Sequence, residues 1–160
     1  MAKPAPRPVP EGMNTLTPHL YFNGNCGQAV EFYQKAFGAE LAAPVVPAPG
    51  GKGVMHAMLK IGNSHVMMAD AWPGQWEKAP QTSTTVGLFL YVEDSYRVFE
   101  RALRAGCEMI FPLADMFWGD RMGKLKDPYG HCWAVATHKL IFTPEEMEQG
   151  QREWLKSLKG

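Results

Sequence analysis

Long hydrophobic runs, an excess of one charge and a full set of cysteines are all missing from this chain of 160 residues. No apolar run approaches the roughly 18 residues that a transmembrane helix needs, so a membrane-spanning helix is excluded. Sixteen basic residues balance sixteen acidic ones, whereas proteins that bind polyanions usually carry a net positive charge. Neither nucleic acid nor a membrane is therefore an expected partner.

Cysteine occurs three times, at Cys26, Cys107 and Cys132, and no pair has the CxxC spacing. An odd number without that spacing argues against a disulfide framework and against a structural zinc cluster. Small reduced interior thiols are typical of a cytoplasmic protein. The N-terminal residues also lack the apolar core of a secretory signal, so the expected location is the cytoplasm.

The remaining composition is that of a globular protein, with 46% hydrophobic and 20% charged residues. The length suits one domain or two small repeated modules. Residues 1–13 contain Pro4, Pro6, Pro8 and Pro10. These prolines forbid a helix and predict an extended, proline-rich arm.

Residues 14–71 have the apolar pattern of a β-α-β-β-β module. Alternation over 16–23 predicts a strand, and the i, i+3, i+4 spacing over 28–37 predicts an amphipathic helix that ends at Gly38. An extended segment (40–46), a loop (47–53) and a strand (54–61) follow. Gly62-Asn63 then reads as a hairpin turn, which leads to a strand over 65–70.

After a linker over residues 72–85, the pattern recurs in residues 86–140. It predicts strands over 86–92, 122–126 and 131–138, an extended segment over 108–112, and a helix from Asp94 or Ser95 to Ala105. A shift of 68 residues maps Gly38-Ala39-Glu40-Leu41 onto Gly106-Cys107-Glu108-Met109, and a shift of 66 maps His65 onto His131. One internal duplication with a short insertion accounts for both shifts.

Residues 141–160 form a separate C-terminal element. Thr143, Pro144 and Glu146 have the spacing of a capping box with proline at the first helical position. They predict a helix with one apolar stripe, either an appended packing element or a dimer contact.

Several segments resemble the PhnB-like branch of the vicinal oxygen chelate superfamily, which includes glyoxalases, bleomycin resistance proteins and extradiol dioxygenases. These segments are 17–24, 29–33, 37–40, 56–57, 68–70, 117–121, 127–133, 136–138 and 143–147. The resemblance implies an α+β fold of paired β-α-β-β-β modules (the glyoxalase/bleomycin resistance/dihydroxybiphenyl dioxygenase fold) with a C-terminal helix. It also implies a homodimer with cavities shared between subunits. It does not define the reaction, because this fold hosts lyases, dioxygenases and plain binding proteins.

Metal-using members of the superfamily hold a divalent ion with one His and one Glu from each half. Here the two His positions correspond to Pro18 or His19 and to Val86 or Gly87, and the two Glu positions correspond to Met68 and Ala134. Of these, only His19 can bind a metal, so the standard quartet is absent. A displaced site for Fe, Ni, Zn or Mn at His19, His56 and Asp70 is the alternative, since two His and one carboxylate are a known ligand set.

A cavity without metal is predicted from strand parity, because Leu20, Phe22, Leu88 and Leu90 are needed against the helices. Its face carries His19, Tyr21, Asn23, Asp70, Phe89 and Tyr91, and Trp118 and Arg121 close the mouth. The same parity turns His131 and Trp133 toward the helices. Near Trp118, Asp120 and Arg121 either orient a planar or anionic ligand or form a surface ion pair.

Two hypotheses about function remain. The first is a glyoxalase-like or dioxygenase-like enzyme with a displaced metal, and the second is a metal-free protein that binds or sequesters a small aromatic molecule. A methyltransferase is not supported, because no glycine-rich nucleotide loop follows a strand.

Overall fold

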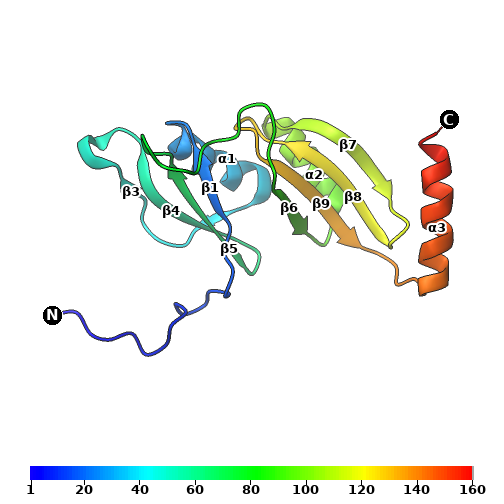
Figure 1. Cartoon of the computed structure of the whole chain (residues 1–160), viewed down its shortest axis with the longest axis horizontal. Coiled ribbons are helices and arrows are strands. Elements are labelled where there is room, and N and C mark those ends of the chain that lie inside the picture. The colour runs from blue at the N-terminus through cyan, green and yellow to red at the C-terminus, as the bar shows by residue number, and fades with distance from the viewer. Residues whose placement is uncertain (160) are drawn as a thin grey trace. The chain divides into compact units, whose positions relative to one another are not determined.

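The computed structural model describes residues 1–159 and divides the chain into two compact units, Met1–Pro80 and the part from Gln81 onward (Figure 1). The first unit contains β1 (His19–Phe22), α1 (Cys26–Phe37), β2 (Glu40–Leu41), β3 (Val46–Pro47), the short 3-10 turn η1 (Pro49–Gly51), β4 (Val54–Ile61) and β5 (Ser64–Asp70). The second unit contains β6 (Gly87–Tyr91), α2 (Ser95–Ala105), β7 (Glu108–Asp115), β8 (Asp120–Lys126), β9 (Cys132–His138) and α3 (Pro144–Ser157). The predicted α+β fold of two β-α-β-β-β modules and a C-terminal helix is confirmed.

The sheet of the first unit has the order β1-β5-β4-β2, with β1 and β5 parallel and β3 also paired to β4. Leu20 and Phe22 are buried on the face that α1 covers, where the Phe22 and Tyr33 rings meet edge to face at 6.3 Å. The expected extended segment over 40–46 is instead two short strands, β2 and β3, which pair separately with β4. Met68 pairs with Leu20 and is fully buried, so it also lies under α1.

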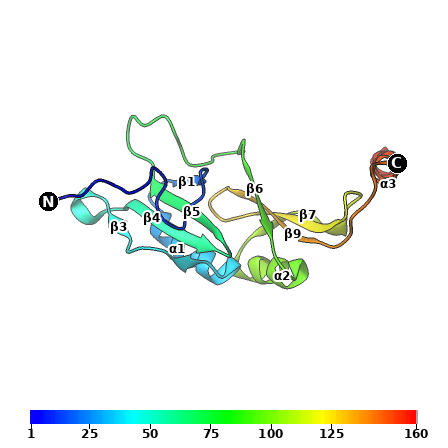
Figure 2. The same cartoon turned by 90° about the horizontal axis from the view of Figure 1, so that it is seen from below.

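The sheet of the second unit repeats this arrangement in the order β6-β9-β8-β7, again with a parallel pair, β6 and β9. Helix α2 packs on one face, against β7, β8 and β9 (Figure 2). Asp94 caps this helix, since its carboxylate accepts a hydrogen bond from the backbone N–H of Arg97. Trp133 is 2% exposed and pairs with Leu88 and Leu125, on the face that α2 covers.

Helix α3 begins at the predicted capping box, in which Thr143 and Glu146 satisfy each other's backbone N–H groups. Its inner side rests on the loop between β7 and β8. Gly150 leaves room for Phe117, and the ring of Trp154 lies 5.9 Å from that of Phe117. Within residues 1–159, no helix is both long and apolar enough to cross a membrane.

Gly119 joins this loop to the chain that leaves β9. Its carbonyl oxygen accepts hydrogen bonds from the backbone N–H groups of Lys139 and Leu140. Its φ of 100° lies outside the range that L-residues favour, and a Cβ at this position would collide with the carbonyl oxygen of Leu140. The position therefore requires glycine, and it holds the neighbouring residues Trp118 and Asp120 against the end of β9.

We expect Gly119→Ala to lower the free energy of unfolding by about 2 kcal/mol or more, because the substitution combines backbone strain with a collision against main-chain atoms. Urea denaturation followed by circular dichroism measures this. Gly62→Ala is the matched control, since Gly62 also has a positive φ (58°) but has open space around it; it should cost about 1 kcal/mol. Equal losses for the two variants would contradict the role given to Gly119.

Candidate functional site

Asp120, at the start of β8, is the centre of a hydrogen-bonded cluster in the second unit. Its side chain is 1% exposed. The hydroxyl of Tyr91 and the indole N–H of Trp118 both donate to Oδ2, each at 2.8 Å. Nδ1 of His138 lies 2.8 Å from Oδ1. Three side chains from β6, from the β7–β8 loop and from β9 are therefore fixed by one carboxylate.

The electrostatics of this cluster keep Asp120 ionised. Burial by itself would raise its pKa, but the hydrogen bonds from His138, Tyr91 and Trp118 outweigh that effect and leave the pKa below the ordinary value of 3.8. The same contact raises the pKa of the Tyr91 hydroxyl, because that hydroxyl donates to an anion. An ionised carboxylate can only accept, so Nδ1 of His138 carries the proton and Nε2 is left as an acceptor.

Register places the cluster on the face of the sheet opposite α2, here called the helix-free face of the second sheet. Residues paired across the strands share a face, and this face carries Phe89, Tyr91, Asp120, Met122, Ala134, Ala136 and His138. The rings of Phe89 and Tyr91 lie 5.1 Å apart, and both side chains are about half exposed. Small and flexible residues, among them Ala134, Ala136 and Met122, form a buried floor on which Trp118 packs. This face offers aromatic walls, an apolar floor and one imidazole acceptor.

Arg121 does not join this group. It pairs with Thr137, one residue out of phase with Asp120, so its side chain leaves from the other face of β8. There its guanidinium donates to Asp115 at 3.1 Å, and both side chains are substantially exposed. Of the two alternatives for this region, Arg121 therefore forms the surface ion pair, and its predicted place at the mouth of the cavity is corrected.

The first unit presents a second group of rings on the helix-free face of its own sheet. His19 and Tyr21 lie on this face of β1, with ring centroids 4.5 Å apart, and His56 of β4 approaches His19 edge to face at 6.3 Å. Burial and the nearby His56 lower the pKa of His19, and the negative charge of Glu77 partly opposes them. Asn23 is exposed just beyond the end of β1. Two imidazoles are thus brought together as the displaced-metal hypothesis requires.

The third predicted ligand, Asp70, is not brought to that pair. It pairs with Phe22, so it leaves β5 on the face that α1 covers. Its two carboxylate oxygens accept hydrogen bonds from the backbone N–H groups of Cys26 (3.0 Å) and Val54 (2.8 Å). The placement of Asp70 beside His19 on one cavity face is therefore corrected, because strand register sends their side chains to opposite sides.

The metal positions implied by the family also change in one detail. Met68 lies under α1, so the residues of β5 on the helix-free face are Met67 and Ala69, which pair with His19 and Tyr21. Ala69 and Ala134, not Met68 and Ala134, thus occupy matching places in the two sheets. Neither alanine nor methionine suits a hard divalent ion. Within residues 1–159 there is no group of three or more His, Cys, Asp or Glu side chains with the geometry of a metal site, so the donor set does not fit the family's metal.

Sequence reasoning considered Asp120 and His138 separately and did not join them. They are 18 residues apart, on two strands whose pairing sets Asp120 opposite His138. A usable signal was the position of each, since Asp120 opens one strand and His138 closes its neighbour. The hairpin between them brings such ends together.

The architecture and the site agree with the comparisons with known proteins. The family model of the Glyoxalase/Bleomycin resistance protein/Dioxygenase superfamily matches residues 15–135. This match covers most of the chain and both modules, and the chain belongs to that superfamily.

Particular relatives place the chain more closely. An uncharacterized protein of Mycobacterium bovis is 40% identical over 126 residues, which cover 75% of this chain and 80% of that protein. The crystal structure of protein PA1353 from Pseudomonas aeruginosa is similar with a TM-score of 0.63 and 29% identity, over 77% of this chain and 96% of that one. A PhnB protein from Bacillus cereus, titled a putative 3-demethylubiquinone-9 3-methyltransferase, has a TM-score of 0.62 at 18% identity, over 78% and 99% of the two chains. At that identity the likeness concerns the fold alone.

Removing the charge of Asp120 tests the cluster. We expect Asp120→Asn to lower the free energy of unfolding at pH 7 by about 3 kcal/mol, because an amide cannot replace a buried anion that accepts three hydrogen bonds. The lowered pKa of Asp120 also means that the wild type has this stabilisation in full above about pH 4 and loses it as the pH falls below that value. The variant should lack this acid loss, and urea denaturation between about pH 2 and pH 7 measures both effects.

Asp115→Asn is the matched control, since Asp115 lies at the other end of the same loop and its side chain is 79% exposed. An exposed ion pair contributes about 0–1 kcal/mol, so this variant should retain the acid dependence of the wild type. An acid limb that is unchanged in Asp120→Asn would show that the carboxylate does not organise the site.

Proposed function

We propose that this chain is a small-molecule-binding member of the superfamily's PhnB-like branch that works without a metal ion. Its ligand is a planar, neutral or singly anionic compound that lies on the helix-free face of the second sheet. The observation that carries this proposal is the Asp120 cluster, in which a buried carboxylate uses its acceptor capacity to fix Tyr91, Trp118 and His138. A carboxylate engaged in this way holds aromatic walls in place and is not available to ligate a metal.

The chemistry of the face supports this class of ligand. Rings of tyrosine, phenylalanine and tryptophan bind flat molecules through stacking and edge contacts. Nε2 of His138 is suited to accept a hydrogen bond from a ligand hydroxyl or N–H group. No basic side chain is part of the face apart from Lys124, which pairs with Ala134, so a phosphorylated ligand is less well matched than a neutral one.

An enzyme is the second candidate, and the contact between His138 and Asp120 favours it. An imidazole whose Nδ1 is held by a carboxylate has its tautomer and orientation set, which is the arrangement of a general base. The reaction in that case would be a proton transfer by His138. The glyoxalase-like and dioxygenase-like reactions with a displaced metal are less well supported, since His19 and His56 lack Asp70 as a third ligand.

Metal retention separates these proposals from a metal enzyme. After incubation with Mn²⁺, Ni²⁺, Zn²⁺ or Fe²⁺ and desalting, we expect elemental analysis to find far less than one ion per chain, because two imidazoles without a carboxylate hold such ions weakly. Retention of one ion per chain that is lost in His19→Ala and His56→Ala would overturn the metal-free proposal.

Ligand binding can be tested with 1-naphthol, a neutral planar probe with one hydroxyl group. In NMR titrations we expect it to shift the indole N–H resonance of Trp118, and we expect Tyr91→Ala to weaken its binding by about 0.5–1.5 kcal/mol through the loss of ring contact. Tyr96→Ala is the matched control, because Tyr96 on α2 is 60% exposed and Tyr91 is 59% exposed. Equal affinity for the two variants would count against this face as the binding site.

The homodimer implied by the family resemblance stays a prediction, as does the cytoplasmic location. Both belong to the proposal. Several apolar side chains at the edge of the second sheet and after β9 are well exposed in the single chain, including Met109, Ile110 and Ile141.

A further inference from the structure

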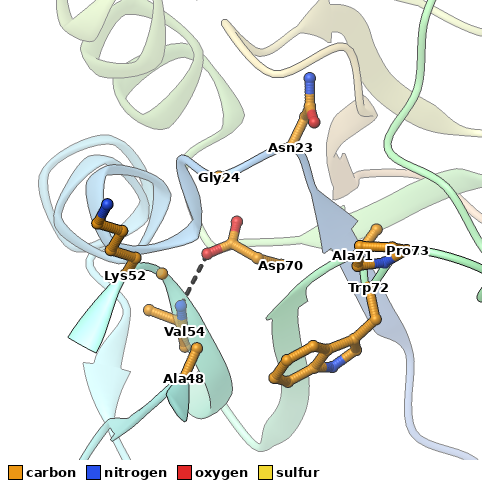
Figure 3. Close-up of a pocket in the computed structure, with 10 residues that line it drawn as sticks. Asn23, Gly24, Ala48, Lys52, Val54, Asp70, Ala71, Trp72 and Pro73 are labelled. Carbon is orange, nitrogen blue, oxygen red and sulfur yellow. Dashed lines mark hydrogen bonds between the residues drawn. The ribbon is translucent and has the colours of Figure 1, made fainter. Parts of the chain in front are cut away.

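A separate cavity of about 420 Å³ lies within the first unit (Figure 3). Its walls come from the turn after β1, the loop that leads into β4 and the chain that leaves β5. Its size falls within the range of pockets that take small ligands. It is distinct from the helix-free faces described above, because Asp70, which lies in it, leaves β5 on the side of α1.

Asp70 holds the walls of this cavity together. One carboxylate oxygen accepts from the N–H of Cys26 at the start of α1, and the other accepts from the N–H of Val54 at the start of β4. Gly53 has a φ of 92°, and a Cβ there would lie 2.9 Å from Oδ2 of Asp70. The loop can approach the carboxylate this closely only with glycine at that position. The cavity is thus built by tertiary contacts and is not a gap between mobile loops.

Three side chains give the cavity its chemical character. Asp70 lies centrally, with Lys52 on one side and Trp72 on another (Figure 3). Among the described residues Lys52 has no ion-pair partner, and the indole N–H of Trp72 has no acceptor. The Trp72 side chain is still 39% exposed, although its backbone N–H is engaged by Gln75. Each oxygen of Asp70 retains a second lone pair after its backbone contact.

An anion, a cation and an aromatic surface around one cavity are complementary to a ligand with the opposite charges and a ring. We propose that this cavity binds a zwitterionic aromatic compound of the amino acid class. The ring packs on Trp72, the carboxylate is bound by the ammonium group of Lys52, and the ammonium group is bound by Asp70. This site goes beyond the proposed function, since it lies in the other unit and uses none of the residues of the Asp120 cluster.

The test uses isothermal titration calorimetry of the full chain with three probes that differ in charge. L-tryptophan carries both charges, tryptamine lacks the carboxylate, and indole-3-propionate lacks the ammonium group. We expect L-tryptophan to bind about fivefold more tightly than either of the others, because each of them loses one partly exposed ionic contact. Asp70 is tested in this way without a substitution that would also remove its backbone hydrogen bonds.

Two variants with matched controls assign the contacts. Lys52→Gln should weaken L-tryptophan about fivefold and leave tryptamine unchanged, whereas Lys78→Gln, at an exposed lysine outside the cavity, should change neither. Trp72→Ala should weaken all three probes about fivefold through loss of the ring contact, whereas Trp76→Ala, at a tryptophan that is 94% exposed and outside the cavity, should not.

The proposal is overturned if L-tryptophan shows no binding up to about 10 mM, if tryptamine or indole-3-propionate binds as tightly as L-tryptophan, or if the variants behave like their controls. Tyr91→Ala should bind L-tryptophan as the wild type does. Failure of this site and failure of the site on the second sheet are therefore distinguishable.

Discussion

A carboxylate placed inside a protein must be satisfied by hydrogen bonds, and that constraint organises both units of this chain. Asp120 joins β6, the β7–β8 loop and β9, and Asp70 joins the starts of α1 and β4 to the end of β5. Asp127 does the same within the turn before β9, where it accepts from the backbone of Tyr129 and His131 and from the indole of Trp133. Each carboxylate lies at the end of a strand, where backbone or side-chain donors lack partners within the sheet.

This use of acidic side chains has a consequence for function. A carboxylate that accepts several hydrogen bonds holds its neighbours in position, but it has little capacity left for a metal ion or for proton transfer of its own. In the Asp120 cluster the groups that it fixes, above all Tyr91, Trp118 and His138, are the ones left to meet a ligand. The superfamily fold is thus retained, while the positions on which its metal chemistry rests are occupied by alanine and methionine.

The two sheets differ in a small structural respect that changes the assignment of faces. In the first unit Leu20 pairs with Met68, and in the second Leu88 pairs with Trp133. The first strands are related by a shift of 68 residues (88 − 20), so the last strands are related by a shift of 65 (133 − 68). Aligning His65 with His131 gives 66, and an error of one residue exchanges the two faces of a strand. This is why Met68 was placed with Ala134 and Asp70 with His19.

The sequence by itself determined the local elements, because each depends on residues close together in the chain. The amphipathic spacing of α1, the turn at Gly62-Asn63, the cap at Asp94 and the capping box at Thr143 are all short-range signals, and the repeated order of elements predicted the fold. Only the tertiary structure decided which side chains share a site. Asp120 with His138, Asp70 with the backbone of Cys26, and Arg121 with Asp115 are set by strand register and loop path. A shift of one residue leaves the apolar pattern almost as good while it turns every polar side chain to the other face.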